Sequence, residues 1–366
     1  MGQIEINHTG SGGGVVLSSD GTDLLLGGSA VGGGGASASD DLYIANPSSA
    51  TSPTAAGTNA VAIGSNSQAV GNEAFSVGIS AKADGNSSIS IGNYSDAMGA
   101  NSLAIGAGGT QSSGTNSVAI GYANSSGNTS FATSIGTYQL SYGASGANSV
   151  AMGYQAKASS SSSFAFSYGA NASGFGGFCA LRNSVAAGTH SLALGNTSSA
   201  NQSFSVALGL QAKSDIERKL AFSAGQFSAQ GDAQSGTFVL RSDTTDATAE
   251  AMTTSNGTAG TTNQVVLPNN SVYGFTGTII ARENSAATND FAIWEVKGGA
   301  VRGSSASTTA LGSYNINTIS ESTGAANWSI AISADTTNGA IAFTVTGEAS
   351  HSIRWVATIN TTEVTY

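Results

Sequence analysis

Large apolar residues recur along the middle of the chain at intervals of fourteen residues. The four-residue strings VAIG, FSVG, ISIG and LAIG begin at Val61, Phe75, Ile89 and Leu103 without a change of spacing. Three further strings begin at Val118, Thr133 and Val150, after intervals of 15, 15 and 17 residues. Five more, again 14 apart, begin at Phe164, Phe178, Leu192, Val206 and Leu220. Twelve copies of one short pattern predict a solenoid, in which each copy stacks on the next.

Each string alternates between large and small residues. Val61 and Ile63 flank Ala62, and the same order holds in nearly every copy. Alternation with a period of two predicts a strand whose large residues face one way and whose small residues face the other. The small residues are Ala62, Ser76, Ser90, Ala104, Ala119, Ser134, Ala151, Ala165, Cys179, Ala193, Ala207 and Ala221. The pattern leaves open which of the two faces turns into the coil.

A second small residue follows the first position of most strings by eight residues, for example at Ala69, Ala83 and Ala158. Each unit therefore contains two short strands and two turns. Stacked at about 4.8 Å per coil, twelve coils would form a parallel β-roll about 60 Å long. Because both the large and the small faces of the strands need to be buried, we expect the rods to associate side by side.

The regions on either side of the repeats have a different character. Residues 1–57 contain glycine runs at 12–14 and 32–35 and are expected to form a flexible attachment arm. Residues 58–231 form the repeat domain, and residues 232–366 are expected to form a β-sandwich or jelly roll. Its predicted strands are Thr237–Arg241, Gln264–Leu267, Tyr273–Arg282, Phe291–Val296, Trp328–Ser333, Ala340–Thr346 and Ser352–Asn360. The predicted fold is thus all-β.

Composition narrows the range of functions. Only 9% of the residues are charged, against about 25% in an ordinary domain, and the net charge is −10. Without a basic stretch, nucleic acid is not an expected partner. The first residues lack the basic and apolar regions of a secretory signal, and no apolar run approaches the roughly 18 residues of a membrane span, so no membrane insertion is expected.

Candidate chemistry is sparse. His8, His190 and His351 are far apart, and Cys179 falls in the column of small residues, which favours a buried filler over a nucleophile. Glycosylation triplets at Asn86, Asn124 and Asn327 are expected by chance in so Asn- and Ser-rich a chain. We therefore expect no catalytic, cofactor-binding or metal-ligating residue, no cofactor and no enzymatic activity; receptor-binding residues are unknown.

Two further kinds of site have candidate residues: a catalytic pair of carboxylates and a tryptophan platform for sugars. Glu73, Asp84 and Asp96 lie in successive coils but in different columns, and Asp290 and Glu295 tend to face opposite sides of a strand, which does not favour a catalytic pair. Three tryptophans lie in predicted strands, where core packing is favoured over a platform that stacks on sugars. They are Trp294, Trp328 and Trp355.

The strings Asn116–Gly121 (NSVAIG) and Asn148–Gly153 (NSVAMG) resemble the head repeat of trimeric autotransporter adhesins of the YadA type. The resemblance extends from about Thr58 to Gly225. It implies a left-handed parallel β-roll in which three chains associate, that is, a homotrimer. The signal peptide, heptad stalk and membrane-anchor barrel of those adhesins have no counterpart in the sequence.

The C-terminal region is similar to the terminal domain of fibre-type virion proteins of tailed bacteriophages, including phages of cyanobacteria. The similar phrases are Leu240–Asp246, Val265–Asn270, Gly274–Gly277 and Asp335–Gly339. The resemblance implies a tail fibre on the virion surface, attached by residues 1–57 to a tail or capsid protein and contacting a host glycan or protein through residues 232–366. A capsid-attached head fibre or decoration protein, a bacterial adhesin fragment and a polysaccharide-degrading spike are the alternatives.

Overall fold

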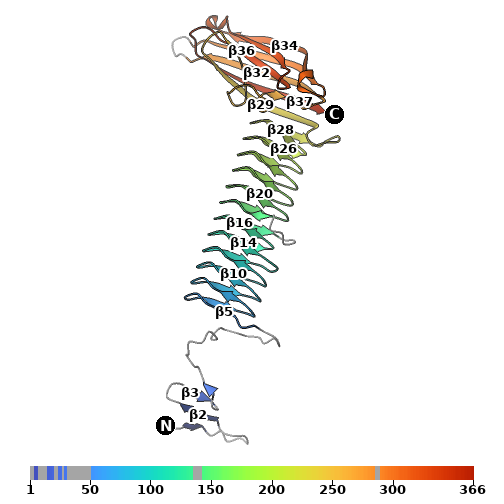
Figure 1. Ribbon diagram of the computed structural model, residues 1–366. Coiled ribbons are helices and arrows are strands. Elements are labelled where there is room, and N and C mark those ends of the chain that lie inside the picture. The colour runs from blue at the N-terminus through green and yellow to red at the C-terminus, as the bar shows by residue number, and fades with distance from the viewer. Residues whose placement is uncertain are drawn as a thin grey trace.

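The computed structural model describes residues 51–134, 142–284 and 289–366, together with four short strands near the N-terminus. These strands are β1 (Ile4–Ile6), β2 (Val15–Ser19), β3 (Leu24–Leu26) and β4 (Ser29–Ala30), and they form one antiparallel sheet. Most of the attachment arm predicted for residues 1–57 lies outside the described residues. From residue 54 onward, a long solenoid leads into a C-terminal β-domain (Figure 1).

The solenoid is a parallel β-roll with two sheets, and each coil contributes one strand to each sheet. Among the described residues the first roll sheet contains β6 (Val61–Ile63), β8 (Phe75–Val77), β10 (Ile89–Ile91), β12 (Leu103–Ile105), β14 (Val118–Gly121), β16 (Phe131–Ser134), β18 (Val150–Met152), β20 (Phe164–Phe166), β22 (Phe178–Ala180), β24 (Leu192–Leu194), β26 (Val206–Leu210) and β28 (Leu220–Ala224). The second roll sheet contains β5 (Thr54–Ala55), β7 (Gln68–Ala69), β9 (Lys82–Ala83), β11 (Asp96–Ala97), β13 (Gln111–Ser112), β15 (Asn124–Ser125), β17 (Gly143–Ala144), β19 (Lys157–Ala158), β21 (Asn171–Ala172), β23 (Val185–Ala186), β25 (Ser199–Ala200) and β27 (Lys213–Ser214). The predicted parallel β-roll of about twelve coils is confirmed.

The small residues of both roll sheets point into the coil. Ala104 and Ala97, from facing strands, have no exposed surface. The large residues of the first roll sheet point outward, and Ile89 and Met152 are 38% and 39% exposed. Serines that enter the interior pair with each other, as Ser90 and Ser95 do with 2.7 Å between their hydroxyl oxygens. The interior of the roll is therefore a narrow column of alanine and serine, and the apolar face lies outside.

One coil has a register that differs from the prediction. Phe131 pairs with Val118 on one side and Val150 on the other, so Ala132 takes the buried small position that the sequence pattern assigned to Ser134. The intervals are thus 13 and 19 residues, not 15 and 17. The TSIG string matches the repeat pattern two residues too late, because FAT immediately before it also alternates large and small residues and keeps the ladder in register.

The turns explain the asparagines and glycines of the repeat. Asn101 and Asn116 occupy equivalent turn positions with φ of 55°, a left-handed conformation that asparagine adopts more readily than most residues. At the turn glycine Gly85, a Cβ would lie 2.0 Å from the carbonyl oxygen of Gly99 in the next coil. Successive backbones therefore approach too closely at this corner for a side chain.

The C-terminal domain is a β-sandwich, as predicted. Its larger sheet has the order β29 (Ala233–Thr244), β37 (Ile353–Thr365), β32 (Ser271–Glu283), β33 (Phe291–Arg302) and β34 (Ala310–Glu321). The smaller sheet contains β30 (Ala249–Ala251), β36 (Ala340–Thr346), β31 (Val265–Val266) and β35 (Ser329–Asp335). Two short 3₁₀ turns, η1 (Ala306–Thr308) and η2 (Thr323–Ala325), flank β34. Buried residues of both sheets, including Phe238, Ile279 and Phe343, form one hydrophobic core.

The first roll sheet continues into the sandwich without a break. β28 pairs antiparallel with β29, where Leu220 lies opposite Thr237, and β29 then pairs with β37. The larger sandwich sheet therefore extends the roll sheet strand by strand, and β34 ends it farthest from the roll (Figure 1). β29 is longer than β28, so its C-terminal half extends laterally beyond the roll.

Ala151→Leu is expected to destabilise the roll. Ala151 is 1% exposed and lies between Ala132 and Ala165, where a leucine has no space. Overpacking of this kind costs about 1–3 kcal/mol per chain, so the thermal midpoint should fall. Val150→Leu, on the outer face one residue earlier, is the control and should change the midpoint less. Equal midpoints for Ala151→Leu and the wild type would contradict a tightly packed interior.

Candidate functional site

Within the described part of the chain, the two histidines and the cysteine lie apart and form no common site. His8 lies outside the described residues. His190 is exposed in a turn, with its ring centroid 5.2 Å from those of both Phe175 and Phe204. His351 Nδ1 lies 2.9 Å from a carboxylate oxygen of Glu283 in the sandwich. Cys179 is buried inside the roll, and burial raises the pKa of its thiol to about 11, so the unreactive protonated form prevails at neutral pH.

The carboxylates are placed by separate structural contacts. Asp84 forms an ion pair with Lys82 at 2.5 Å, and Lys82 lies opposite Asp96 in the neighbouring coil. Lys82 thus stands between two carboxylates of different columns, and burial raises the pKa of Asp96. Asp290 accepts a hydrogen bond from Ser322 Oγ at 2.7 Å, while Glu295 is exposed on β33. Within the described residues, no group of three or more acidic, histidine or cysteine side chains is placed to hold a metal ion.

The tryptophans are core residues, as the sequence favoured. Trp294, Trp328 and Trp355 are 4%, 4% and 1% exposed. The rings of Trp294 and Trp355 stack with 5.7 Å between centroids, and Trp355 Nε1 donates to Thr244 Oγ1 at 2.9 Å. With their faces covered by one another and by the two sheets, these rings are not available to stack on a sugar.

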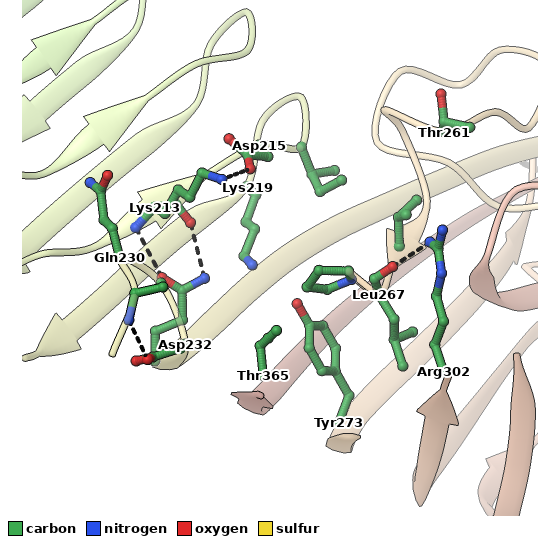
Figure 2. A pocket seen from close by; sticks show the side chains of 16 residues that line it. Lys213, Asp215, Lys219, Gln230, Asp232, Thr261, Leu267, Tyr273, Arg302 and Thr365 are labelled. Atoms are coloured by element: carbon green, nitrogen blue, oxygen red, sulfur yellow. Dashed lines mark hydrogen bonds and ion pairs between the residues drawn. The ribbon is translucent and has the colours of Figure 1, made fainter. Parts of the chain in front are cut away.

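A pocket of about 400 Å³ lies where the last coils of the roll meet the sandwich. Figure 2 shows Lys213, Asp215 and Lys219 entering from the roll, and Tyr273 and Arg302 from the sandwich. Lys213 pairs with Asp215 at 2.9 Å, so their charges compensate each other. The Arg302 guanidinium donates to the carbonyl oxygen of Leu267.

A buried ion pair forms the floor of this junction. Lys219 Nζ lies 2.6 Å from Glu363 Oε2, and the two side chains are 3% and 0% exposed. Glu363 also accepts hydrogen bonds from Gln234 Nε2 at 2.8 Å, Tyr273 Oη at 3.1 Å and Thr361 Oγ1 at 2.6 Å. Burial and the Glu363 charge raise the pKa of Tyr273 well above its usual value of 10, so its hydroxyl remains a donor.

The last coil departs from the repeat at two of the positions that contact the sandwich. Lys219 takes the column that holds serine in the three coils ending in Ser163, Ser191 and Ser205. Ile216 takes the turn column that holds glycine in most coils, with Ser160 and Gln202 as the earlier exceptions, and its side chain joins the hydrophobic core of the sandwich. Neither residue is among the predicted site residues; the one signal in the sequence is a lysine in a column that holds only alanine, serine and glycine in the earlier coils.

The loop after the roll is fixed in place on the coils beneath it. The Asp232 carboxylate accepts hydrogen bonds from the backbone N–H groups of Phe227, Ser228 and Ala229, which lower its pKa. The Gln230 amide donates to the carbonyl oxygens of Thr197 and Ala212 in two different coils. Because the charged groups here are engaged with one another or with the backbone, the junction is built as a rigid joint.

Comparison with known proteins supports the reading of the repeats. The model of the YadA head domain repeat matches residues 55–137, 144–166 and 186–212, about a third of the chain. These segments are similar to YadA head repeats. No curated protein matches the sequence. Within the described residues, no helix has the length and apolar character needed to cross a membrane.

Solved structures of phage tailspike proteins align with the chain at low similarity. Tailspike gp49 of Acinetobacter baumannii bacteriophage Fri1, a capsular polysaccharide depolymerase, is 10% identical with a TM-score of 0.23, over 81% of this chain and 49% of that one. The tailspike of Acinetobacter phage vB_ApiP_P1 is 9% identical with a TM-score of 0.21, over 89% and 81%. The tailspike of A. baumannii phage AM24 is 12% identical with a TM-score of 0.19, over 84% and 56%. This chain spans about half the length of the first of these proteins, and TM-scores of this size do not establish a common fold.

Lys219→Met is expected to destabilise the protein strongly, because it leaves the Glu363 carboxylate buried without its cation. Removing one partner of a buried pair costs about 3–5 kcal/mol. Adding Glu363→Gln should recover part of this loss, which chemical denaturation of both variants would measure. Lys213→Met, which breaks a pair that is 42% and 47% exposed, is the control and should cost less than about 1 kcal/mol. Equal losses for the two lysine variants would contradict a special role for the buried pair.

Proposed function

We propose that this chain is a non-enzymatic homotrimeric fibre protein of a bacteriophage particle, in which the roll is a stiff spacer and the C-terminal sandwich contacts the host surface. The observation that carries the proposal is the outward apolar face of the first roll sheet. This face is repeated in every coil and continues, through β28 and β29, into the sheet of the sandwich.

The exposed apolar face supports side-by-side association of identical chains. Val61, Ile120 and Phe222, at widely separated coils, are 43%, 38% and 55% exposed. Soluble monomers rarely leave an apolar stripe of this length in water. A second copy presents the same stripe at the same spacing, which suits it to cover the first. The YadA head repeat, which the chain matches over three segments, implies three such copies.

The sandwich is better suited than the roll to recognise a specific receptor. Successive coils present nearly the same serine, asparagine and glycine surface, whereas the sandwich carries long loops on a rigid scaffold, where binding residues commonly lie. We therefore assign virion attachment to residues 1–57 and host contact to residues 232–366. Three weak contacts on one trimer gain strength through effective concentration. A capsid-attached head fibre or a surface adhesin fragment would use the same architecture.

The full chain is expected to sediment as a trimer, with three times the chain mass of 35.9 kDa. Phe222→Asp should weaken the trimer and shift the protein toward smaller species, because it puts a charge on the apolar stripe. Lys157→Asp, on the second roll sheet, is the control and should leave the trimer intact. A wild-type protein that is a stable monomer at micromolar concentration would refute the homotrimer.

Purified full-length protein is expected to compete with intact particles for adsorption to the host. Antibodies against the chain should label the same particles in negative stain, either on the tail or on the capsid. An unrelated fibre at equal concentration is the control. If particles are labelled but a large excess of folded trimer leaves adsorption unchanged, the chain is a spacer or decoration protein and not the attachment protein.

A further inference from the structure

Three arginines meet on one corner of the larger sandwich sheet. Arg241 lies on β29, Arg354 on β37 and Arg282 on β32, and all three are exposed on the outer face. The register places Arg354 directly between Asp243 and Arg282. Arg241 is two residues before Asp243 and so points to the same side. We call this group the arginine corner; it holds three of the 11 basic residues of a chain with net charge −10.

The charges of the arginine corner are not balanced. Cross-strand neighbours have their Cβ atoms about 4.5–5.5 Å apart, and like charges in such a pair are destabilising. Asp243 lies 3.6 Å from Arg354, with side chains 56% and 69% exposed. Arg282 donates to the neutral side chain of Asn289 at 2.9 Å, and Arg241 has no ion pair within the described residues. Three cations therefore share one carboxylate.

Apolar surface adjoins these guanidinium groups. Phe291 on β33 lies directly opposite Arg282 and is 37% exposed. Ile280 and Val356 form the next row on the same face and are 47% and 45% exposed. A pyranose ring that bears a carboxylate presents an apolar C–H face and an anionic group, which match an aromatic ring beside paired guanidinium groups.

The arginine corner lies about six residues along β29 from the point where the roll meets the sandwich. The roll's apolar stripe meets β29 at Thr237, opposite Leu220. Asp243 is six residues further along the strand, about 20 Å away at the usual rise per residue. The corner therefore lies on the part of the larger sandwich sheet that extends beyond β28, and not on the roll strands that carry the apolar stripe.

We propose that the arginine corner binds an acidic polysaccharide through its carboxylates; this rests on the proposed function in host contact. Guanidinium groups bind carboxylates in a bidentate manner. Because salt screens exposed charges, the affinity of such a site for an anion falls as the salt concentration rises. Nucleic acid is the less suitable polyanion, because three cations on an acidic chain neutralise few phosphates. The three copies in a trimer would engage one polymer together.

Binding of the full chain to polygalacturonate, measured by biolayer interferometry at low salt, tests the proposal. We expect binding that weakens with salt and that falls by about tenfold or more in Arg282→Gln/Arg354→Gln. Lys157→Gln/Lys82→Gln, which removes two cations from the roll, should lose less than about twofold. The arginine variant should keep the wild-type thermal midpoint or exceed it, because it removes a like-charge pair.

Equal losses in the two double variants, absence of binding to polygalacturonate, or equal binding to neutral dextran would each overturn the proposal. Polyphosphate or single-stranded DNA bound as tightly as polygalacturonate would also overturn it, since the corner would then recognise charge alone. These results are separable from those for the fibre. If the protein still sediments as a trimer and labels particles, the proposed function stands while the arginine corner fails.

Discussion

The narrow space between the two roll sheets governs the rest of the structure. Mainly alanine and serine fill it, with Cys179 and Thr110, so the interior of each coil buries little apolar surface and contributes correspondingly little hydrophobic stabilisation. Coils are held instead by the backbone ladder to their neighbours and by paired hydroxyl groups such as Ser112 and Ser117. A roll of this kind is stable as a stack and not as separate units.

Two consequences of this constraint appear at the surfaces that the stack leaves open. Large side chains that do not fit inside are placed on the outer face of the first roll sheet, which is the surface we assign to association. The end of the stack needs a cover as well, and Ile216 and Lys219 supply it by entering the sandwich. At the far edge, β34 is irregularly paired near Ile293 and Gly298 of β33, and irregularities of this kind discourage further strand addition.

How much the sequence predicts depends on whether a feature repeats. The roll and its strands follow from columns of residues, and alternation also locates most sandwich strands. The coil at Phe131 is misplaced because two neighbouring strings fit the pattern equally well. No strand is predicted at β34, because nearly all of its residues are exposed and buried residues do not alternate with exposed ones along it. The ion pair of Lys219 and Glu363 joins residues 144 positions apart, a contact that no local pattern encodes.

The coil with the long interval shows how the rod sets its own length. Nineteen residues separate Phe131 from its partner Val150, yet β16 and β18 pair as closely in register as strands fourteen residues apart. Extra residues therefore add nothing to the rise, which depends on the number of coils. Gain or loss of a whole repeat would lengthen or shorten the rod by one fixed step of about 4.8 Å, with both ends unchanged. Reach can thus change in discrete increments through duplication of a 42-nucleotide unit, independently of what either end binds.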